Sequence, residues 1–356
     1  MIRPPEYVLG IQPYVPGKPI EELERELGIS NSVKLASNEN PVGPSPAAMK
    51  AIGEGFADIN RYPDGSGFYL KKALSKELGI REEEIILGNG SNELLDLAAK
   101  TFMKDGDEAV MATPSFVVYF MSVQSVGGKS VQVPLKNYTH DLSAMADSIT
   151  PATKMIFIAN PNNPTGTINK KDEFEIMMKR VPDDVLVVMD EAYFEYVSDP
   201  DYADSMKYLR SEKNVLILRT FSKIYGLAGL RLGYGIARKE IITDMNRLRA
   251  PFNTSTIAQK AGIAALYDKE HVGRSREVNG AGKEYLYREL GALGISFVPT
   301  EANFIYIPIE GSAALYEKLL RMGVIIRPMG PNAVRVTIGL PEENRRLIEA
   351  LKAAKG

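Results

Sequence analysis

Residues 155–166 read MIFIANPNNPTG, an unbroken apolar run that stops at a turn rich in asparagine, proline and glycine. Residues 185–193, VLVVMDEAY, and residues 214–223, NVLILRTFSK, repeat this layout. A continuous apolar run of this length is typical of a strand that is covered on both faces, as in a parallel sheet. Together with a further strand at Ala109–Met111, these stretches predict an α/β fold with a mostly parallel sheet flanked by helices.

Amphipathic segments and turn signals extend this pattern in both directions. Helices are expected over Pro19–Leu27 and Phe68–Leu78, and a glycine directly follows each of them. After residue 265 the order changes to a small α+β pattern, with strands at 303–309, 324–326 and 334–338 and helices at 312–321 and 342–354. We therefore expect an N-terminal arm that packs with a small domain (1–45), a large α/β domain (46–260) and the small C-terminal α+β domain (261–356).

The composition excludes several classes of protein and site. The 356 residues are 44% hydrophobic and 25% charged, which suits a globular protein with a sizeable core. A net charge of −2 does not suit a nucleic-acid binder, and no apolar run reaches the roughly 18 residues of a membrane span. Cysteine is absent, and His140 and His271 lie far apart, so no metal site is expected. The N-terminus lacks a signal pattern, and we expect a cytoplasmic protein.

Polar side chains follow the predicted strands at the sheet edge where α/β proteins bind their ligands. Asn163 follows the first run, Asp190 and Tyr193 follow the second, and Lys223 follows the third. Residues 88–92, GNGSN, open another predicted helix, and a helix N-terminus of small residues forms a seat for phosphate. Pyridoxal phosphate (PLP) needs such a seat, an amine for its aldehyde, a carboxylate for its ring nitrogen and neutral donors for its ring oxygen. The pattern therefore favours a PLP site.

Each of these motifs also has a simpler interpretation when it is taken alone. A lysine after a strand is usually solvated, NPTG can be only a turn, and an Asp-Glu pair can cap a helix. Two nucleotide-binding patterns fail, because Val123 replaces the first glycine of a P-loop before 127–130 and residues 88–93 lack the third glycine of a dinucleotide fingerprint. The combination of polar groups at matching strand ends is what favours the cofactor site.

The elements NPTG, D-x-A-Y and S-K-x7-R, in this order, resemble those of the fold type I aminotransferases, the aspartate aminotransferase superfamily. The resemblance implies the fold type I PLP-transferase architecture and PLP as cofactor. It implies that Lys223 forms the Schiff base and moves protons, and that Asp190 pairs with the ring nitrogen. Asn163 and Tyr193 would contact the ring oxygen, and Tyr119 would stack on the pyridine ring. The cofactor phosphate is expected at Gly90, Ser91, Asn92, Thr220, Ser222 and Arg231.

Other stretches resemble one branch of that superfamily, the histidinol-phosphate aminotransferase family. They are PYVPGK at 13–18, KLASNENP at 34–41, RYPD at 61–64 and NPNNPTG at 160–166. The resemblance implies a homodimer in which Tyr62 reaches the partner's cofactor. It also implies substrate contacts from Tyr14, Asn38, Arg327 and Arg335.

The reaction that this resemblance implies belongs to histidine biosynthesis. L-Histidinol phosphate would give its amino group to 2-oxoglutarate, which yields imidazole-acetol phosphate and L-glutamate. Paired arginines suit such an exchange, because a guanidinium binds a phosphate and a carboxylate with the same bidentate geometry. Three alternatives stay open: an aromatic amino-acid aminotransferase and a threonine-phosphate decarboxylase would share these cofactor residues, and a non-catalytic PLP-binding protein would be a different class.

Overall fold

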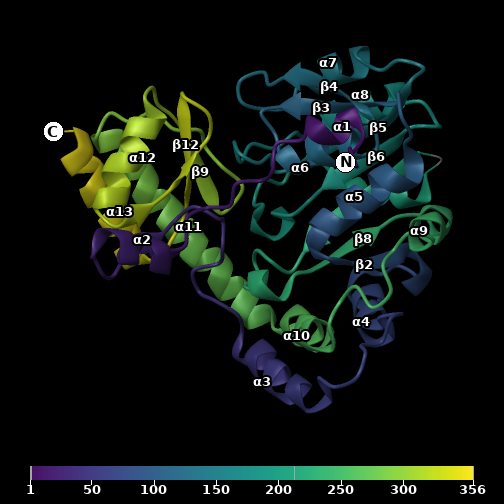
Figure 1. The fold of residues 1–356 in the computed structure, drawn as a ribbon, viewed down its shortest axis with the longest axis horizontal. Helices are drawn as coiled ribbons and strands as arrows, with labels where there is room; N and C mark the ends of the chain where they lie inside the picture. The colour runs from purple at the N-terminus through teal and green to yellow at the C-terminus, as the bar shows by residue number, and fades with distance from the viewer. Residues whose placement is uncertain (1, 212, 356) are drawn as a thin grey trace.

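The computed structural model describes residues 2–211 and 213–355, and a long helix links its two lobes (Figure 1). The large lobe is built on a seven-stranded sheet with the order β2-β8-β7-β6-β5-β3-β4. Strands β7, β6, β5, β3 and β4 run parallel, and β8 is antiparallel to both of its neighbours. The strands are β2 (Ile85–Asn89), β3 (Glu108–Thr113), β4 (Lys129–Pro134), β5 (Thr153–Ala159), β6 (Leu186–Asp190), β7 (Asn214–Thr220) and β8 (Leu232–Ile236).

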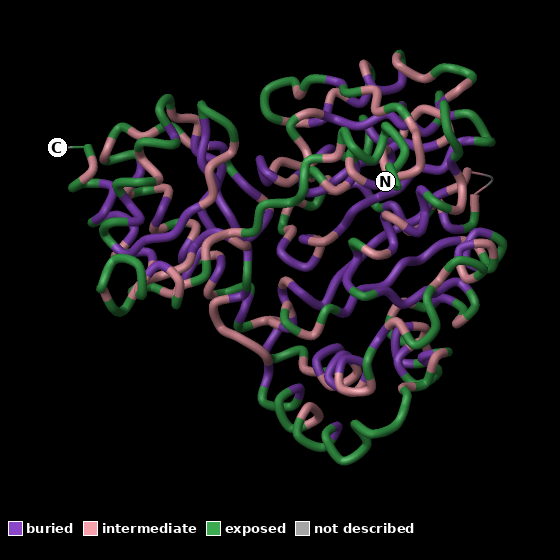
Figure 2. The backbone as a smooth tube through the Cα atoms, in the orientation of Figure 1, coloured by how far each residue is buried: buried purple, intermediate pink, exposed green. Residues whose placement is uncertain are grey.

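Helices cover both faces of this sheet. Met155 and Phe157 of β5 enter one hydrophobic core, and Ile156 and Ile158 enter the other. The backbone of the central strands is accordingly buried along most of its length (Figure 2). The first core is covered by α5 (Gly90–Phe102), α6 (Val117–Ser125) and α9 (Lys239–Asn246). The second is covered by α3 (Pro46–Gly55), α4 (Phe68–Leu78), α7 (Leu142–Asp147), α8 (Lys171–Arg180) and α10 (Thr256–Tyr267). The continuous apolar runs are therefore strands that are buried on both faces, as the sequence predicts.

The small lobe has its own sheet and core. Its antiparallel sheet has the order β11-β12-β9, and its core contains side chains from three helices. Its elements are α11 (Lys269–Ala292), β9 (Phe304–Pro308), α12 (Ser312–Arg321), β10 (Val324–Ile325), β11 (Arg327–Pro328), β12 (Ala333–Thr337) and α13 (Pro341–Lys355).

The N-terminal arm contacts both lobes. Its strand β1 (Val33–Lys34) pairs in parallel with β10, and Leu23 of α2 (Ile20–Leu27) packs in a small core with Leu320. The short helix α1 (Glu6–Leu9) instead lies against α6 of the large lobe.

Short 3₁₀ helices lie at Phe56–Asp58 (η1), Glu82–Glu84 (η2), Phe194–Tyr196 (η3), Ser205–Arg210 (η4) and Ala228–Leu230 (η5). None of the helices within residues 2–211 and 213–355 is long and apolar enough to cross a membrane.

The expected boundary between the two domains falls inside a helix. Residue 260 lies in the middle of α10, and Ala261 and Ala265 of this helix are buried in the core of the large lobe. The helix α11 then runs toward the small sheet (Figure 1). We therefore propose that the division between the large and small domains lies within α11.

Candidate active site

A phosphate-sized seat is formed where the first turn of α5 meets β8. Gly90 has a φ of +72°, and its N–H donates to the carbonyl of Arg231 at 2.8 Å. A Cβ on Gly90 would lie 2.3 Å from Nη2 of Arg231, and one on Gly233 would lie 2.5 Å from the backbone nitrogen of Ser91. Glycine is needed at both positions for this close approach. The helix N-terminus is thereby placed at the pocket, where Ser91 and Asn92 line the wall.

Arg231 and the loop after β7 complete this seat, which we call the phosphate cup. Nη1 of Arg231 donates to Oγ of Ser222 at 3.3 Å and to the carbonyl of Ala228 at 3.1 Å. The N–H of Ser222 in turn donates to Oγ1 of Thr220 at 3.0 Å. Arg231 forms no ion pair with any carboxylate that the structure describes. An unpaired guanidinium beside a helix N-terminus favours the binding of an anion.

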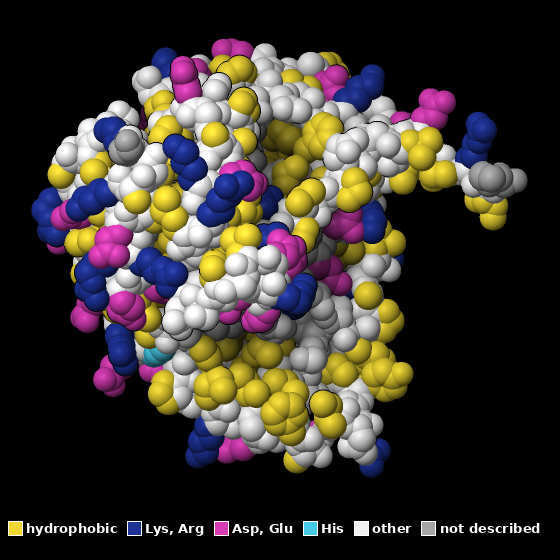
Figure 3. Space-filling model, turned by 60° about the vertical axis from the view of Figure 1, so that its left-hand side comes forward, with side chains coloured by type: hydrophobic (Ala, Val, Ile, Leu, Met, Phe, Trp, Pro, Cys, Tyr) yellow, Lys and Arg dark blue, Asp and Glu magenta, His cyan; other side chains and the backbone are white. Residues whose placement is uncertain are grey.

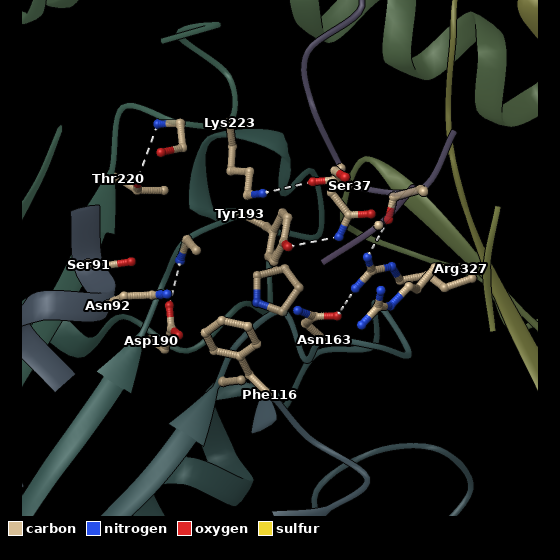
Figure 4. A pocket seen from close by; sticks show the side chains of 18 of the residues that line it. Ser37, Ser91, Asn92, Phe116, Asn163, Asp190, Tyr193, Thr220, Lys223 and Arg327 are labelled. Carbon is tan, nitrogen blue, oxygen red and sulfur yellow. Dashed lines mark hydrogen bonds between the residues drawn. The ribbon is translucent and has the colours of Figure 1, made fainter. Parts of the chain in front are cut away.

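Lys223 extends into the centre of the pocket. Its Nζ donates to the carbonyl of Ser37 at 3.3 Å and lies 5.5 Å from the centre of the Tyr193 ring (Figure 4). Burial, followed by the positive charge of Arg335, lowers the pKa of Lys223 to about 8. A minor but appreciable fraction of this amine is therefore neutral near physiological pH, and the neutral form is the one that attacks a carbonyl carbon.

Asp190 ends β6 on the floor of the pocket. Its Oδ2 accepts a hydrogen bond from the Tyr119 hydroxyl at 2.6 Å, and its Oδ1 accepts one from the N–H of Ala192 at 3.1 Å. Burial raises the pKa of Asp190, and these two hydrogen bonds oppose that rise. No cation of the described residues lies within ion-pair distance of this carboxylate. A buried carboxylate without such a partner suits a ligand that brings a protonated ring nitrogen.

The ring of Tyr119 packs against another aromatic ring within the protein. This side chain is fully buried, and its ring stacks on Phe157 with centres 4.9 Å apart. The ring of Phe116 also lines the pocket, and Figure 4 shows it beside Asp190 and Asn163. The reason lies in where α6 begins: Phe116 precedes the helix, whereas Tyr119 lies in its first turn on the face that packs against the sheet. We therefore propose that Phe116, which sequence reasoning missed, contacts the cofactor ring in place of Tyr119.

Two arginines form a second cationic region at the other side of the pocket. Arg335 of β12 donates from Nη1 to Oδ1 of Asn163 at 2.5 Å and from Nη2 to the carbonyl of Ala36 at 2.7 Å. Its Nε is buried and has no hydrogen-bond partner among the described residues. Arg327, its cross-strand neighbour, donates to the carbonyl of Val15 at 2.9 Å. We call the two side chains the arginine pair.

The arm contributes an aromatic ring to this region. The guanidinium of Arg327 lies 5.6 Å from the centre of the Tyr14 ring. Neither arginine forms an ion pair with a carboxylate in residues 2–211 or 213–355. A buried N–H without a partner and the absence of a neutralising carboxylate both favour an anionic ligand here.

Two predicted site residues are placed differently from the rest. Asn38 lines the pocket, but its Nδ2 already donates to the Tyr193 hydroxyl at 2.9 Å and its Oδ1 accepts from Thr337 at 3.2 Å. One N–H and one lone pair of its amide are therefore already engaged within the protein. Tyr62 lies outside the pocket of its own chain, 82% exposed, with its ring stacked on Phe252 at 4.7 Å.

The other predicted residues converge on one cavity, and Gly90 supports it through its backbone. The predicted residues that line this cavity are Tyr14, Asn38, Ser91, Asn92, Tyr119, Asn163, Asp190, Tyr193, Thr220, Ser222, Lys223, Arg231, Arg327 and Arg335. The cavity thus combines a reactive amine, a buried carboxylate and two separate anion seats.

Comparison with known proteins places the chain in a family. Residues 30–351 match the family described as aminotransferase class I and II, and the chain belongs to this family. It is 52% identical over 353 residues to the histidinol-phosphate aminotransferase of Moorella thermoacetica, covering 98% of this chain and 92% of the relative. It is 49% identical over 350 residues to histidinol-phosphate aminotransferase 1 of Nitrosococcus oceani, covering 97% and 95%. Within the family it therefore groups with the histidinol-phosphate aminotransferases, as the sequence motifs predict.

A solved structure supports the same grouping. The crystal structure of histidinol-phosphate aminotransferase from Sinorhizobium meliloti in complex with pyridoxal-5'-phosphate matches with a TM-score of 0.91 at 27% identity. The match covers 98% of this chain and 96% of that one. The predicted fold type I architecture is confirmed.

Proposed function

We propose that this chain catalyses the PLP-dependent transfer of the amino group of L-histidinol phosphate to 2-oxoglutarate in histidine biosynthesis. The products are imidazole-acetol phosphate and L-glutamate. The proposal is supported by relatives of 52% and 49% identity over nearly the whole chain. The observation that carries it is the pair of anion seats on either side of Lys223, the phosphate cup and the arginine pair (Figure 4).

The residues of the pocket fit PLP. The phosphate cup would hold its phosphate, Lys223 its aldehyde, and Asp190 its ring nitrogen. Tyr193 and Asn163 would donate to its ring oxygen, and Phe116 would contact its ring face. When bound, PLP supplies an electron-withdrawing ring that takes up the charge left on a carbon atom after a proton departs.

Lys223 is suited to move that proton. Its pKa of about 8 lies close to physiological pH, so the amine can both accept and release a proton near neutrality. Tyr193 keeps its own hydrogen, because burial raises the pKa of its hydroxyl to about 12. It can therefore act as a hydrogen-bond donor throughout the working pH range.

The arginine pair would bind both substrates by their anionic ends. Histidinol phosphate carries a phosphate and no carboxylate, whereas glutamate carries carboxylates and no phosphate. A single seat must therefore accept two different anions in turn. Guanidinium groups do so, because their N–H groups match the oxygen spacing of both.

Replacing Arg335 by lysine is expected to impair both half-reactions. Lysine keeps the charge but loses the two-pronged donation and the bond to Asn163, and such charge-assisted bonds contribute about 1.5 to 3 kcal/mol. Single-turnover rates with L-histidinol phosphate and with L-glutamate should each fall by about 10- to 100-fold at subsaturating substrate. Arg327→Lys is the matched control at the outer position, where a smaller loss is expected. If Arg335→Lys slowed one amino donor and left the other unchanged, the shared seat would be refuted.

The substrate assignment is tested by comparing amino donors. Purified protein is supplied with PLP, 2-oxoglutarate and one amino donor at a time. At equal, low donor concentrations, glutamate should form fastest with L-histidinol phosphate. A preference for phenylalanine or tyrosine would indicate an aromatic amino-acid aminotransferase. Release of carbon dioxide from threonine phosphate without glutamate formation would indicate the decarboxylase, and inactivity with every donor would favour a PLP-binding protein without catalysis.

We further propose that the active unit is a homodimer. Large hydrophobic side chains are exposed over α3, α4 and the loops beside them, and they gather at the lower end of the molecule in Figure 3. They are Met49, Phe56, Ile59, Tyr62, Phe68, Tyr69, Leu248 and Phe252. A contiguous apolar surface of this kind is typical of a subunit interface. Tyr62 lies within it and outside its own pocket, which suits a contribution to the partner's phosphate cup.

Mixing two inactive variants should test this exchange of Tyr62. Lys223→Ala lacks the amine, and Tyr62→Ala lacks the donated side chain, so each alone should be nearly inactive at limiting PLP. In a mixed dimer, one site combines intact Lys223 with intact Tyr62 from the other chain. Random reassociation should therefore restore about a quarter of the wild-type activity per site. If Tyr62 served its own chain, the mixed sample would stay as inactive as its parents.

A further inference from the structure

Asn38 is anchored to the small lobe by three hydrogen bonds. Its backbone N–H donates to Oγ1 of Thr337 at 2.9 Å, and the Thr337 hydroxyl donates to its Oδ1 at 3.2 Å. Its carbonyl accepts from Nδ2 of Asn303 at 3.1 Å. Asn38 is 1% exposed and has a φ of +55°, a conformation that asparagine tolerates better than most residues. The segment is thus fixed in place with the side chain directed to one target.

That target is the Tyr193 hydroxyl of the large lobe, to which Nδ2 of Asn38 donates at 2.9 Å. The hydrogen bonds at Thr337 favour this orientation of the amide. Thr337 accepts the backbone N–H of Asn38, so its own hydrogen is free for Oδ1. If the Oδ1 and Nδ2 atoms of Asn38 exchanged places, the Thr337 hydroxyl hydrogen would be buried without an acceptor on Asn38.

The donation has a direct chemical consequence for Tyr193. A phenol carries one hydrogen and two lone pairs, and Asn38 offers only N–H at this contact. The Tyr193 oxygen must therefore act as the acceptor toward Asn38, and its single hydrogen is directed elsewhere. The ring is held edge-on against Phe304, with centres 5.0 Å apart, so the hydroxyl stays in the pocket.

We propose that Asn38 is a positioning residue that orients the Tyr193 hydroxyl hydrogen into the pocket, toward the ring oxygen of bound PLP. This inference rests on the proposed function and extends it to a residue that acts through Tyr193. It gives Asn38 a role besides the substrate contact that the sequence resemblance implies. The role follows from hydrogen-bond direction, because an amide N–H at this position leaves the hydrogen of Tyr193 free for the pocket, whereas an acceptor there would take it.

Several charged or titratable groups face Tyr193 and must be considered in any titration. Arg335 approaches from β12, Asp190 from the end of β6, and Tyr14 from the N-terminal arm. Lys223 lies on the ring face, 5.5 Å from its centre. Arg335, Asp190 and Tyr14 are unchanged in sequence when Asn38 alone is replaced, whereas Lys223 carries the group whose titration is measured.

The test is the pH dependence of the visible absorbance of the PLP-loaded protein. The deprotonated chromophore places negative charge on the ring oxygen, so a hydroxyl donor there lowers the pH midpoint. Asn38→Asp keeps the shape of the side chain and tolerates the left-handed backbone. Its carboxylate accepts the Tyr193 hydrogen and turns it away from the ring oxygen. The midpoint is therefore expected to rise by about one pH unit, a roughly tenfold change in proton affinity.

Two further variants distinguish the effect of turning the Tyr193 hydroxyl from the effect of adding a negative charge at position 38. Asn38→Gly adopts the same backbone freely and removes the amide without adding an acceptor, so a smaller rise is expected. In a Tyr193→Phe background there is no hydroxyl to turn, and Asn38→Asp should then shift the midpoint far less than in wild type. An equal shift in both backgrounds would show that charge alone acts, and would overturn the inference.

The remaining outcomes are also decisive. If the aspartate variant does not accumulate, Asn38→Gly in both backgrounds serves instead, and a rise that does not require Tyr193 overturns the inference. Unchanged midpoints in both Asn38 variants would overturn it as well. A wild-type protein that gains no visible absorbance with PLP would instead refute the proposed function, so the two failures are distinguishable.

Discussion

Lys223→Ala is expected to lower turnover by at least about a thousandfold, because the variant loses both the amine that holds PLP and the group that moves the proton. The phosphate cup is untouched, so PLP should still bind reversibly, as free aldehyde. The visible band of the lysine-bound cofactor should then be missing at every pH. Absorbance spectra and turnover with saturating L-histidinol phosphate measure both effects.

Lys223→Arg is the matched control, because it keeps a positive charge in the same place and lacks a neutral amine at any accessible pH. It should be as inactive as the alanine variant. In wild type, the rate of covalent PLP capture should increase as the pH rises through about 8 and then level off, because the neutral fraction of Lys223 grows over that range. Turnover of Lys223→Ala within tenfold of wild type would contradict the assignment.

Asp190→Asn is expected to retain PLP and to lower turnover by about a hundredfold, the kinetic equivalent of losing one strong charge-assisted hydrogen bond. A neutral amide cannot keep the ring nitrogen protonated, and an uncharged ring accepts the charge of the reacting carbon poorly. Single-turnover measurements with L-histidinol phosphate report this step without product release. An unchanged single-turnover rate would show that Asp190 does not serve the ring nitrogen.

Tyr119→Phe provides the control for this prediction. It keeps the aromatic stack on Phe157 and removes only the hydroxyl that donates to Asp190, so a loss below about tenfold is expected. Stability gives a second readout. Because burial raises the pKa of Asp190 in the folded, cofactor-free protein, its ionisation weakens the fold as the pH rises through that raised value. Cofactor-free Asp190→Asn should therefore be at least as stable as wild type at neutral pH.

The sequence predicts the central strands well because their signal is local. Strands β5, β6 and β7 are continuous apolar runs. β6 ends in Asp190 and β7 in Thr220, and Asn163 lies in the turn after β5, so each run is followed closely by a polar residue of the pocket. The sequence does not predict strand β8, because its residues, LGYGI, include two glycines, which weaken a strand pattern. In the structure, one of these glycines admits the first turn of α5, so the feature that hides the strand also builds the phosphate cup.

The residues that sequence reasoning misplaces depend on distant or precise geometry. Tyr119 and Phe116 are three positions apart, and their roles depend on the exact start of α6. Asn38 and Thr337 are separated by 299 positions, so their hydrogen bonds leave no local pattern. The expected contact of Tyr62 with the partner's cofactor involves a second chain, and it stays a prediction.

The central claim is that one pocket holds PLP on Lys223 and accepts the amino group of L-histidinol phosphate. The most direct test is the visible spectrum of the PLP-loaded protein, titrated with L-histidinol phosphate in the absence of any oxo acid. We expect the band of the lysine-bound cofactor to disappear while that of the aminated cofactor grows, and 2-oxoglutarate should then reverse the change. A band that ignores L-histidinol phosphate and responds to another amino compound would contradict the substrate assignment, and the absence of any band would contradict the cofactor site itself.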